Sequence, residues 1–197
     1  MYNFTFNIPT KIHFGKDTIS SLSELKAYGS KVLLEYGGGS IKKNGLYDTA
    51  MKILKDAGLT VFELSGVEPN PKIETVRKGV EICKNEGIDM VLAIGGGSTI
   101  DCSKVVAAGA KYDGDAWDLV LDGSKVKSAL PIFDVLTLSA TGTEMDPFAV
   151  ISDMSKNEKW GTGSPYMVPT MSILNPEYTF SVSKKQTAAG TADMMSH

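Results

Sequence analysis

Short, continuous apolar runs alternate along the chain with longer stretches whose apolar residues recur every three or four positions. The apolar runs are typical of strands that are buried on both faces of a parallel sheet. The longer stretches have the period of helices with one buried face, and Gly58 and Gly87 are expected to end two of them. In the first half of the chain the predicted strands are 31–36, 59–64 and 90–94, and the predicted helices are 46–57, 73–84 and 101–110. This alternation predicts βαβ units, and therefore an α/β fold with a Rossmann-like parallel sheet.

The other segments carry weaker patterns. Two prolines in residues 68–71 force extended backbone before each of them, so a loop is expected there. Ser183 is expected to be the N-cap of a last helix that runs to His197. Further strands are predicted at 130–138, 148–151 and 171–174, an irregular polar segment anchored by Trp117 at 113–128, and turns at 139–143 and 156–163.

Composition and charge narrow the class of protein. A chain of 197 residues with 42% hydrophobic and 22% charged residues can bury one good core. The net charge is -3 and the basic residues are spread along the chain, which argues against nucleic acid as a partner. The apolar runs are far shorter than the ~20 residues that span a bilayer, and no signal-peptide pattern opens the chain. We therefore expect no membrane partner, a cytoplasmic protein, and reduced thiols at Cys83 and Cys102.

Two copies of Gly-Gly-Gly-Ser, at 37–40 and 95–98, each follow a predicted strand and precede a predicted helix. Backbone N–H groups of such a turn, together with the helix N-terminus, can face a phosphate. One copy alone is equally consistent with a tight connection between strand and helix. Two copies at the carboxyl ends of parallel strands favour nucleotide phosphates, because ligands bind along that edge of an open α/β sheet.

The second copy carries a longer pattern. Residues 95–104 read Gly-Gly-Gly-Ser-Thr-Ile-Asp-Cys-Ser-Lys, which resembles the Gly-Gly-Gly-Ser-x-x-Asp-x-x-Lys segment of the iron-containing (group III) alcohol dehydrogenases and related glycerol dehydrogenases. The resemblance continues in order through 67–71, 136–144 and 189–197, and is strongest to the butanol dehydrogenase type. It implies an enzyme that transfers hydride between NAD(P) and a small alcohol or aldehyde, and a homodimer at full length.

The resemblance also implies which residues bind the cofactor. The pyrophosphate would lie on the second glycine turn, with one acidic residue near the nicotinamide ribose or the substrate entrance: Gly95, Gly96, Gly97, Ser98 and Asp101. Further contacts would come from Asn70, Thr137, Leu138, Thr141, Thr143, Lys159 and Tyr178. The alternatives are turn capping for the threonines, a solvated turn lysine for Lys159 and an Asx-turn for Asn70.

The first glycine turn bears on the choice of cofactor. It consists of Gly37, Gly38, Gly39 and Ser40. In the family, members that prefer NAD tend to have an acidic residue at the position of Gly39, where it binds the ribose 2′-hydroxyl. Since Gly39 has no carboxylate, and Lys42 and Lys43 follow closely, NADP is favoured over NAD. Glu35 lies just upstream, and its side-chain direction is left open by the sequence.

Asp193 and His197 stand four residues apart on the last predicted helix, so both project from one face. By itself the pair is more typical of a hydrogen bond on a helix surface. It matches the Asp-x-x-x-His metal ligands of the family, which implies Fe²⁺ or Zn²⁺. The family has two more histidine ligands further downstream, whereas the only other histidine here is His13, which is expected to be a structural or surface residue.

The resemblance therefore implies one whole domain and the beginning of a second. Residues 1–181 would form the dinucleotide-binding domain, and 182–197 the first helix of a helical metal-binding domain that is truncated here. The chain alone is then expected to be inactive. Two other functions stay open: a nucleotide-binding module without catalysis, and a metal- and NAD-dependent enzyme similar to dehydroquinate synthase.

Overall fold

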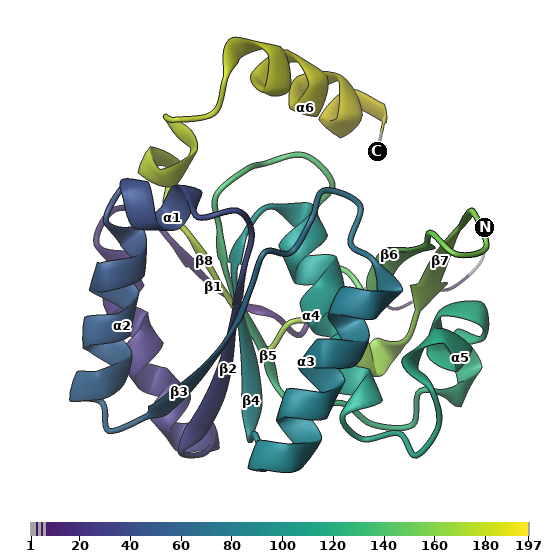
Figure 1. The fold of residues 1–197 in the computed structure, drawn as a ribbon. Helices are drawn as coiled ribbons and strands as arrows, with labels where there is room; N and C mark the ends of the chain where they lie inside the picture. The colour runs from purple at the N-terminus through teal and green to yellow at the C-terminus, as the bar shows by residue number, and fades with distance from the viewer. Residues whose placement is uncertain (1–2, 4, 6, 197) are drawn as a thin grey trace.

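Residues 3, 5 and 7–196 are described by the computed structural model of the chain, which is built around one sheet (Figure 1). The sheet has six parallel strands in the order β1-β8-β5-β4-β2-β3. Their bounds are β1 Lys11–Phe14, β2 Lys31–Tyr36, β3 Thr60–Ser65, β4 Met90–Gly95, β5 Ile132–Leu136 and β8 Met171–Leu174. The predicted α/β class with a parallel sheet is confirmed.

Helices cover both faces of this sheet, and a separate hairpin lies at its side (Figure 1). The α-helices are α1 Ser40–Lys43, α2 Leu46–Asp56, α3 Ile73–Glu86, α4 Gly97–Gly109, α5 Ala116–Leu121 and α6 Lys184–Ser196. The 3₁₀ segments are η1 Thr18–Tyr28, η2 Gly123–Lys125, η3 Pro165–Met167 and η4 Pro176–Thr179. The hairpin consists of β6 Phe148–Asp153 and β7 Glu158–Gly163, which pair antiparallel.

The sheet has a hydrophobic core on each face because successive side chains of a strand point to opposite sides. On β2, Val32 and Leu34 belong to the cluster that includes residues of η1 and α2. Leu33 points the other way, into the cluster formed with α3, α4 and α5. Both clusters contain fully buried side chains, which explains why the central strands read as continuous apolar runs.

Three of the predicted segments need correction. Residues 113–128 are not irregular, because they contain α5: the Asp115 carboxylate accepts from the Trp117 N–H at 2.9 Å and caps the helix. Residues 156–163 are not a turn, because 158–163 form β7, which is stabilised by its pairing with β6. Helix α4 begins at Gly97, four residues before the predicted start, with Gly96 as its N-cap.

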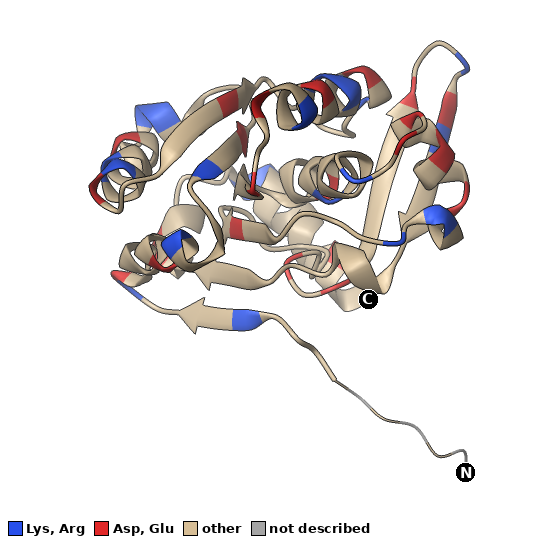
Figure 2. Cartoon of the chain, turned by 90° about the horizontal axis from the view of Figure 1, so that it is seen from below, with Lys and Arg blue, Asp and Glu red and all other residues tan. Residues whose placement is uncertain are grey.

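The other predicted segments agree with the structure to within a few residues, whereas η1 and α1 were not predicted. The N-cap of α6 is confirmed, since the Gln186 N–H donates to Ser183 Oγ at 3.3 Å. Cys83 and Cys102 are buried free thiols, as expected. Within the described residues, no helix has the length and apolar character that crossing a bilayer requires. Basic and acidic residues are interspersed over the helices and loops, and the strands at the centre carry few of either (Figure 2).

Candidate functional site

Three loops meet at the carboxyl edge of the sheet. They follow β2, β4 and β5, which are neighbours in the sheet, so the turns 37–40 and 95–98 and the loop 137–143 lie in one row. The Thr137 N–H donates to the Gly95 carbonyl at 2.9 Å and fixes the loop beside the second glycine turn. The structure thus brings both glycine turns and the predicted threonine segment together at one edge. Helix α6 lies across this same edge (Figure 1).

The second glycine turn opens directly into α4, a helix of 13 residues. Gly96 has extended backbone, with φ -90° and ψ -171°, and Gly97 is the first helical residue. A Cβ at Gly96 would lie 3.4 Å from Leu138 Cβ, and a Cβ at Gly97 would lie 3.3 Å from Thr141 Oγ1. Side chains there would fill the space between the turn and the loop 137–143. The residues therefore fit a pyrophosphate that approaches the backbone closely at a helix N-terminus.

Asn70 connects two more of the predicted residues to this turn. Its N–H donates to Ser98 Oγ at 3.3 Å, and its side-chain oxygen accepts from Lys159 Nζ at 2.6 Å. Asn70 has a left-handed backbone, with φ 55°, a conformation that asparagine tolerates better than most residues. Lys159 comes from β7, so it is a strand residue engaged with Asn70. The exposed residues Asn70 and Lys159 and the partly buried Ser98 consequently form a polar row along one side of the edge.

Asp101 and Thr143 belong to a buried polar network whose centre is the lysine that ends the motif 95–104, a residue to which the sequence analysis gave no role. Lys104, on α4, is fully buried, and its ammonium donates to Thr143 Oγ1, Asp146 Oδ1 and the Phe148 carbonyl, each at 2.8 Å. The Thr143 hydroxyl donates in turn to Asp101 Oδ1 at 2.7 Å. The network holds the hairpin and the loop 137–143 against α4.

Burial has opposite effects on the two charges of this network. It lowers the pKa of Lys104, which the hydrogen bond to Asp146 opposes. It raises the pKa of Asp101, although the Thr143 hydroxyl and the Val150 N–H stabilise the carboxylate. The signal in the sequence was a lysine directly before the apolar run 105–108, because a lysine that is buried with such a run requires several acceptors. Thr141 caps this turn, because its Oγ1 accepts from the Thr143 N–H at 3.3 Å, and its role as a cofactor contact stays a prediction.

At one position of the first glycine turn the backbone conformation itself requires glycine. Gly39 has φ 97°, which side chains rarely adopt, and it is the N-cap of α1. Gly38 has open space around it. The Gly66 N–H donates to the Gly37 carbonyl at 3.2 Å and ties the turn to the loop that carries Asn70.

Glu35 points away from this edge and into the core beneath α4. Its side chain is fully buried, and neither carboxylate oxygen has a hydrogen-bond partner among the described residues. Burial raises its pKa to about 8, and the nearby Ser103 hydroxyl and Cys102 thiol only partly oppose that shift. Glu35 is therefore unavailable to a ribose hydroxyl, which answers the question that the sequence left open.

Tyr178 lies on the other side of the sheet from Asn70 and Lys159. It belongs to η4, packs on the cluster with η1 and α2, and lines a pocket with Asn44, Gly45 and Leu46. Tyr178 therefore lies next to the start of α2 and does not line the second glycine turn. Its role as a cofactor contact stays a prediction.

The predicted metal ligands lie on and beyond α6. This helix contacts the body at Gly190, where a Cβ would be 2.9 Å from the Ser139 carbonyl oxygen. Asp193 is half-buried, and His197 lies outside the described residues. Over residues 3, 5 and 7–196 there is no group of three or more His, Cys, Asp or Glu side chains placed to hold a metal ion. His13 Nε2 lies 3.2 Å from Glu24 Oε1, a contact that is consistent with a structural role for His13.

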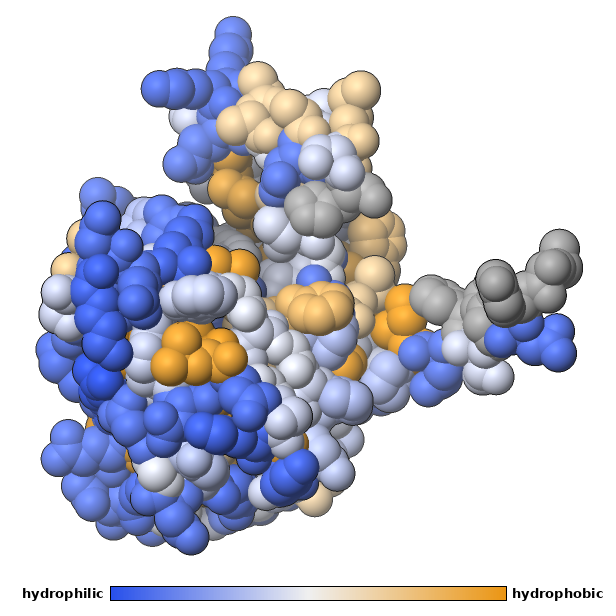
Figure 3. Space-filling view, turned by 90° about the vertical axis from the view of Figure 1, so that its right-hand side faces the viewer, coloured by the Kyte–Doolittle hydropathy of each residue, from blue (hydrophilic) through white to orange (hydrophobic). Residues whose placement is uncertain are grey.

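Most of the surface on the side that carries the β6–β7 hairpin is hydrophilic, and apolar atoms form separate patches on it (Figure 3). Exposed apolar side chains of the hairpin are Phe148, Val150, Met154 and Trp160. The geometry supports a ligand site best at the carboxyl edge, where the second glycine turn meets the N-terminus of α4.

Comparison with known proteins gives consistent matches over the whole chain. A family model described as iron-containing alcohol dehydrogenase matches residues 9–176. NADH-dependent butanol dehydrogenase A of Clostridium acetobutylicum is 61% identical over 198 residues, which cover all of this chain and 51% of that protein. The NADPH-dependent aldehyde reductase of Escherichia coli is 40% identical, with 100% and 51% covered.

A solved structure gives the same result. The crystal structure of NADH-dependent butanol dehydrogenase A from Thermotoga maritima superposes with a TM-score of 0.97 at 49% identity, covering 100% of this chain and 50% of the other. The chain therefore spans about half the length of the relatives that it matches.

Proposed function

The chain belongs to the iron-containing alcohol dehydrogenase family, and from this premise we propose that it binds NAD(P) along the carboxyl edge of its sheet. We propose further that the full-length protein transfers hydride between this cofactor and a small alcohol or aldehyde. The observation that carries the proposal is the second glycine turn. Its backbone faces the loop 137–143 across a space that a single Cβ would fill, at the N-terminus of α4.

The chain's own residues would bind and orient the dinucleotide. Backbone N–H groups at Gly96 and Gly97 would hold the pyrophosphate, since the α4 N-terminus favours negative charge. Asn70 and Lys159 would fix the neighbouring part of the cofactor from the side. When bound, the nicotinamide ring supplies the hydride acceptor or donor, and the protein supplies orientation and electrostatics.

The described residues do not by themselves supply enough ligands for a catalytic metal ion. Asp193 and His197 would supply two ligands, whereas catalytic metal sites usually have three or more from the protein. We therefore propose the pair as part of an iron or zinc site and derive no step of the reaction from it. In the same proposal, α6 begins a second domain after residue 181.

Dinucleotide binding is tested by a side chain at Gly96. Gly96→Val should weaken NADPH binding at least about tenfold, equivalent to about 1.4 kcal/mol, because the added methyl groups occupy the space next to Leu138. The extended backbone of Gly96 accepts valine, so the fold should persist. Fluorescence titration measures the dissociation constant, and circular dichroism checks the fold.

Gly161→Val is the matched control, because Gly161 lies on β7 with open space around it. It should leave the dissociation constant unchanged. Equal affinities in wild type and Gly96→Val would refute the assignment of the pyrophosphate site. Dinucleotide binding by a full-length protein that oxidises no alcohol and reduces no aldehyde would instead favour the nucleotide-binding module.

We also propose that the first glycine turn accepts the 2′-phosphate of NADP. Gly39→Asp should lower the ratio of NADPH to NADH affinity about tenfold, since a carboxylate repels the phosphate and accepts hydrogen bonds from a free ribose. Any side chain at Gly39 strains the backbone, so Gly39→Asn serves as the control that shares the strain without the charge. If the two variants give the same ratio, the 2′-phosphate does not approach Gly39.

A further inference from the structure

One lysine at the first glycine turn is held in a cage of two aromatic rings and a carboxylate. Lys42 lies on α1, two residues after Ser40. Its ammonium nitrogen is 4.9 Å from the ring centroid of Tyr36 and 4.4 Å from that of Tyr47. It is also 4.0 Å from Glu63 Oε2. Cation–π attraction and the ion pair together keep this ammonium beside the carboxyl ends of β2 and β3.

Each oxygen of the cage's carboxylate accepts a hydrogen bond from one tyrosine. The Tyr36 hydroxyl donates to Glu63 Oε2 at 2.7 Å, and the Tyr47 hydroxyl donates to Oε1 at 2.8 Å. The hydrogen bond from Tyr36 is the main cause that lowers the pKa of Glu63. The contact with Tyr36 likewise raises the pKa of Lys42. Both groups are therefore charged at neutral pH, and the cage as a whole is close to neutral.

Glu63 occupies the place in the fold where dinucleotide-binding proteins have an acidic residue that binds the ribose. Dinucleotide-binding folds have a glycine turn after one strand and, about 20 residues later, an acidic residue that accepts the ribose 2′-hydroxyl. Here the glycine turn follows β2, and Glu63 stands near the end of β3, the neighbour of β2 in the sheet. Its two oxygens already accept from Tyr36 and Tyr47, so a free ribose would have to share this carboxylate with the two tyrosines.

We propose that Lys42 is the group that binds the 2′-phosphate of the cofactor, and that Glu63, by holding Lys42 through the tyrosine cage, limits the preference for NADP over NAD. This inference rests on the proposed function. Lys42 is half-exposed, so its flexible stem can turn from the cage to a phosphate near Ser40. Binding of the phosphate must then compete with Glu63 and the two rings, whereas a free ribose leaves the cage intact.

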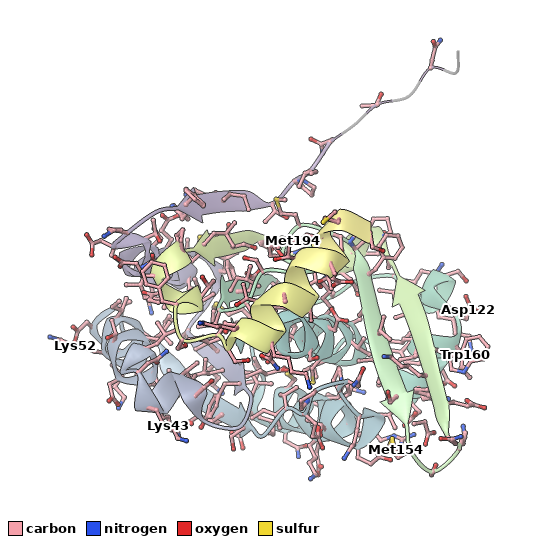
Figure 4. All side chains as sticks on the ribbon, turned by 90° about the horizontal axis from the view of Figure 1, so that it is seen from above. Lys43, Lys52, Asp122, Met154, Trp160 and Met194 are labelled. Atoms are coloured by element: carbon pink, nitrogen blue, oxygen red, sulfur yellow. The ribbon has the colours of Figure 1, made fainter. Side chains whose placement is uncertain are left out.

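The adjacent lysine is not equivalent. Lys43 is exposed, and the view from the side of α6 shows it at the outer edge of the molecule (Figure 4). The two lysines have the same charge and lie on the same short helix, so Lys43 is a control for any general effect of positive charge.

The test measures binding of adenosine 2′,5′-bisphosphate and of 5′-AMP, which differ only in the 2′-phosphate, by isothermal titration calorimetry. In Lys42→Met the affinity for the bisphosphate should fall about tenfold, and the affinity for 5′-AMP should change less than about twofold. In Glu63→Gln the bisphosphate should bind several-fold more tightly, because Lys42 is released. Lys43→Met should alter neither ligand.

Each other outcome overturns a separate statement. If Lys42→Met weakens both ligands equally, or if Lys43→Met has the same effect as Lys42→Met, Lys42 is not the selective group. If Glu63→Gln leaves the bisphosphate affinity unchanged or lowers it, the statement that Glu63 restrains Lys42 is wrong. If the wild-type protein binds neither ligand, the proposed dinucleotide site itself is wrong, which is distinguishable from failure of the cage.

Discussion

Glu35→Gln is expected to make the protein more stable, and the gain should grow as the pH rises from about 5 to about 8. The pKa of Glu35 is about 8 in the folded protein, against an ordinary value of 4.5. Between these values the unfolded chain releases a proton that the folded chain retains. The stability contributed by protonated Glu35 is complete below pH 4.5 and is lost progressively up to pH 8. The loss is about 1.4 kcal/mol per pH unit, or roughly 4 kcal/mol between pH 5 and pH 8.

Glutamine has the shape of the protonated acid and cannot ionise, so the variant should escape this loss. Urea unfolding at pH 5, 6.5 and 8 measures the difference in unfolding free energy between variant and wild type. Glu81→Gln, at an exposed position on α3, is the control and should show no such trend. A difference that stays constant with pH would mean that Glu35 is hydrated or paired in solution.

His197→Ala is expected to remove bound metal and nearly all turnover from the full-length protein, with at least about a thousandfold loss. A metal ion stabilises transition-state charge by several kcal/mol, and each ~1.4 kcal/mol corresponds to a tenfold change in rate. NADPH affinity should be retained, because the glycine turns lie on the sheet. Metal analysis, NADPH titration and an alcohol oxidation assay measure the three quantities separately.

His13→Ala is the matched control for this prediction. His13 lies on β1 next to Glu24, and its replacement should leave metal content and turnover intact. A His197→Ala protein that keeps its metal and its activity would show that the Asp193–His197 pair is a hydrogen-bonded pair on the helix surface. Loss of NADPH binding together with the metal would show that the two sites are not independent.

The periodicity of the chain was sufficient to predict the central architecture. Strands such as β2 and β4 are continuous apolar runs because both of their faces are covered, and that pattern is visible residue by residue. The helical period of 46–57 follows from one buried stripe, which again needs only local sequence. Glycine turns after β2 and β4 were predictable as phosphate sites, since chain order alone places them at one edge of a parallel sheet.

Elements that depend on pairing or packing with another segment were predicted wrongly or not at all. β7 has glycines and polar residues where a strand pattern would need apolar ones, and its register is set by β6. α5 is short, and its apolar residues meet α3 and α4 only after folding. Lys104 appears as one charge in a helix, whereas its acceptors come from the segment 143–148.

By itself, therefore, the sequence determined the α/β class, the two glycine turns at one edge of the sheet and the family to which the chain belongs. The tertiary structure alone decided the direction of individual charged side chains. Glu35 is buried beneath α4, Lys42 is caged by Tyr36 and Glu63, and Lys43 is exposed. The physical reason is that periodicity records which positions are buried, while the fate of a charge depends on the dielectric and the partners that distant segments bring to it.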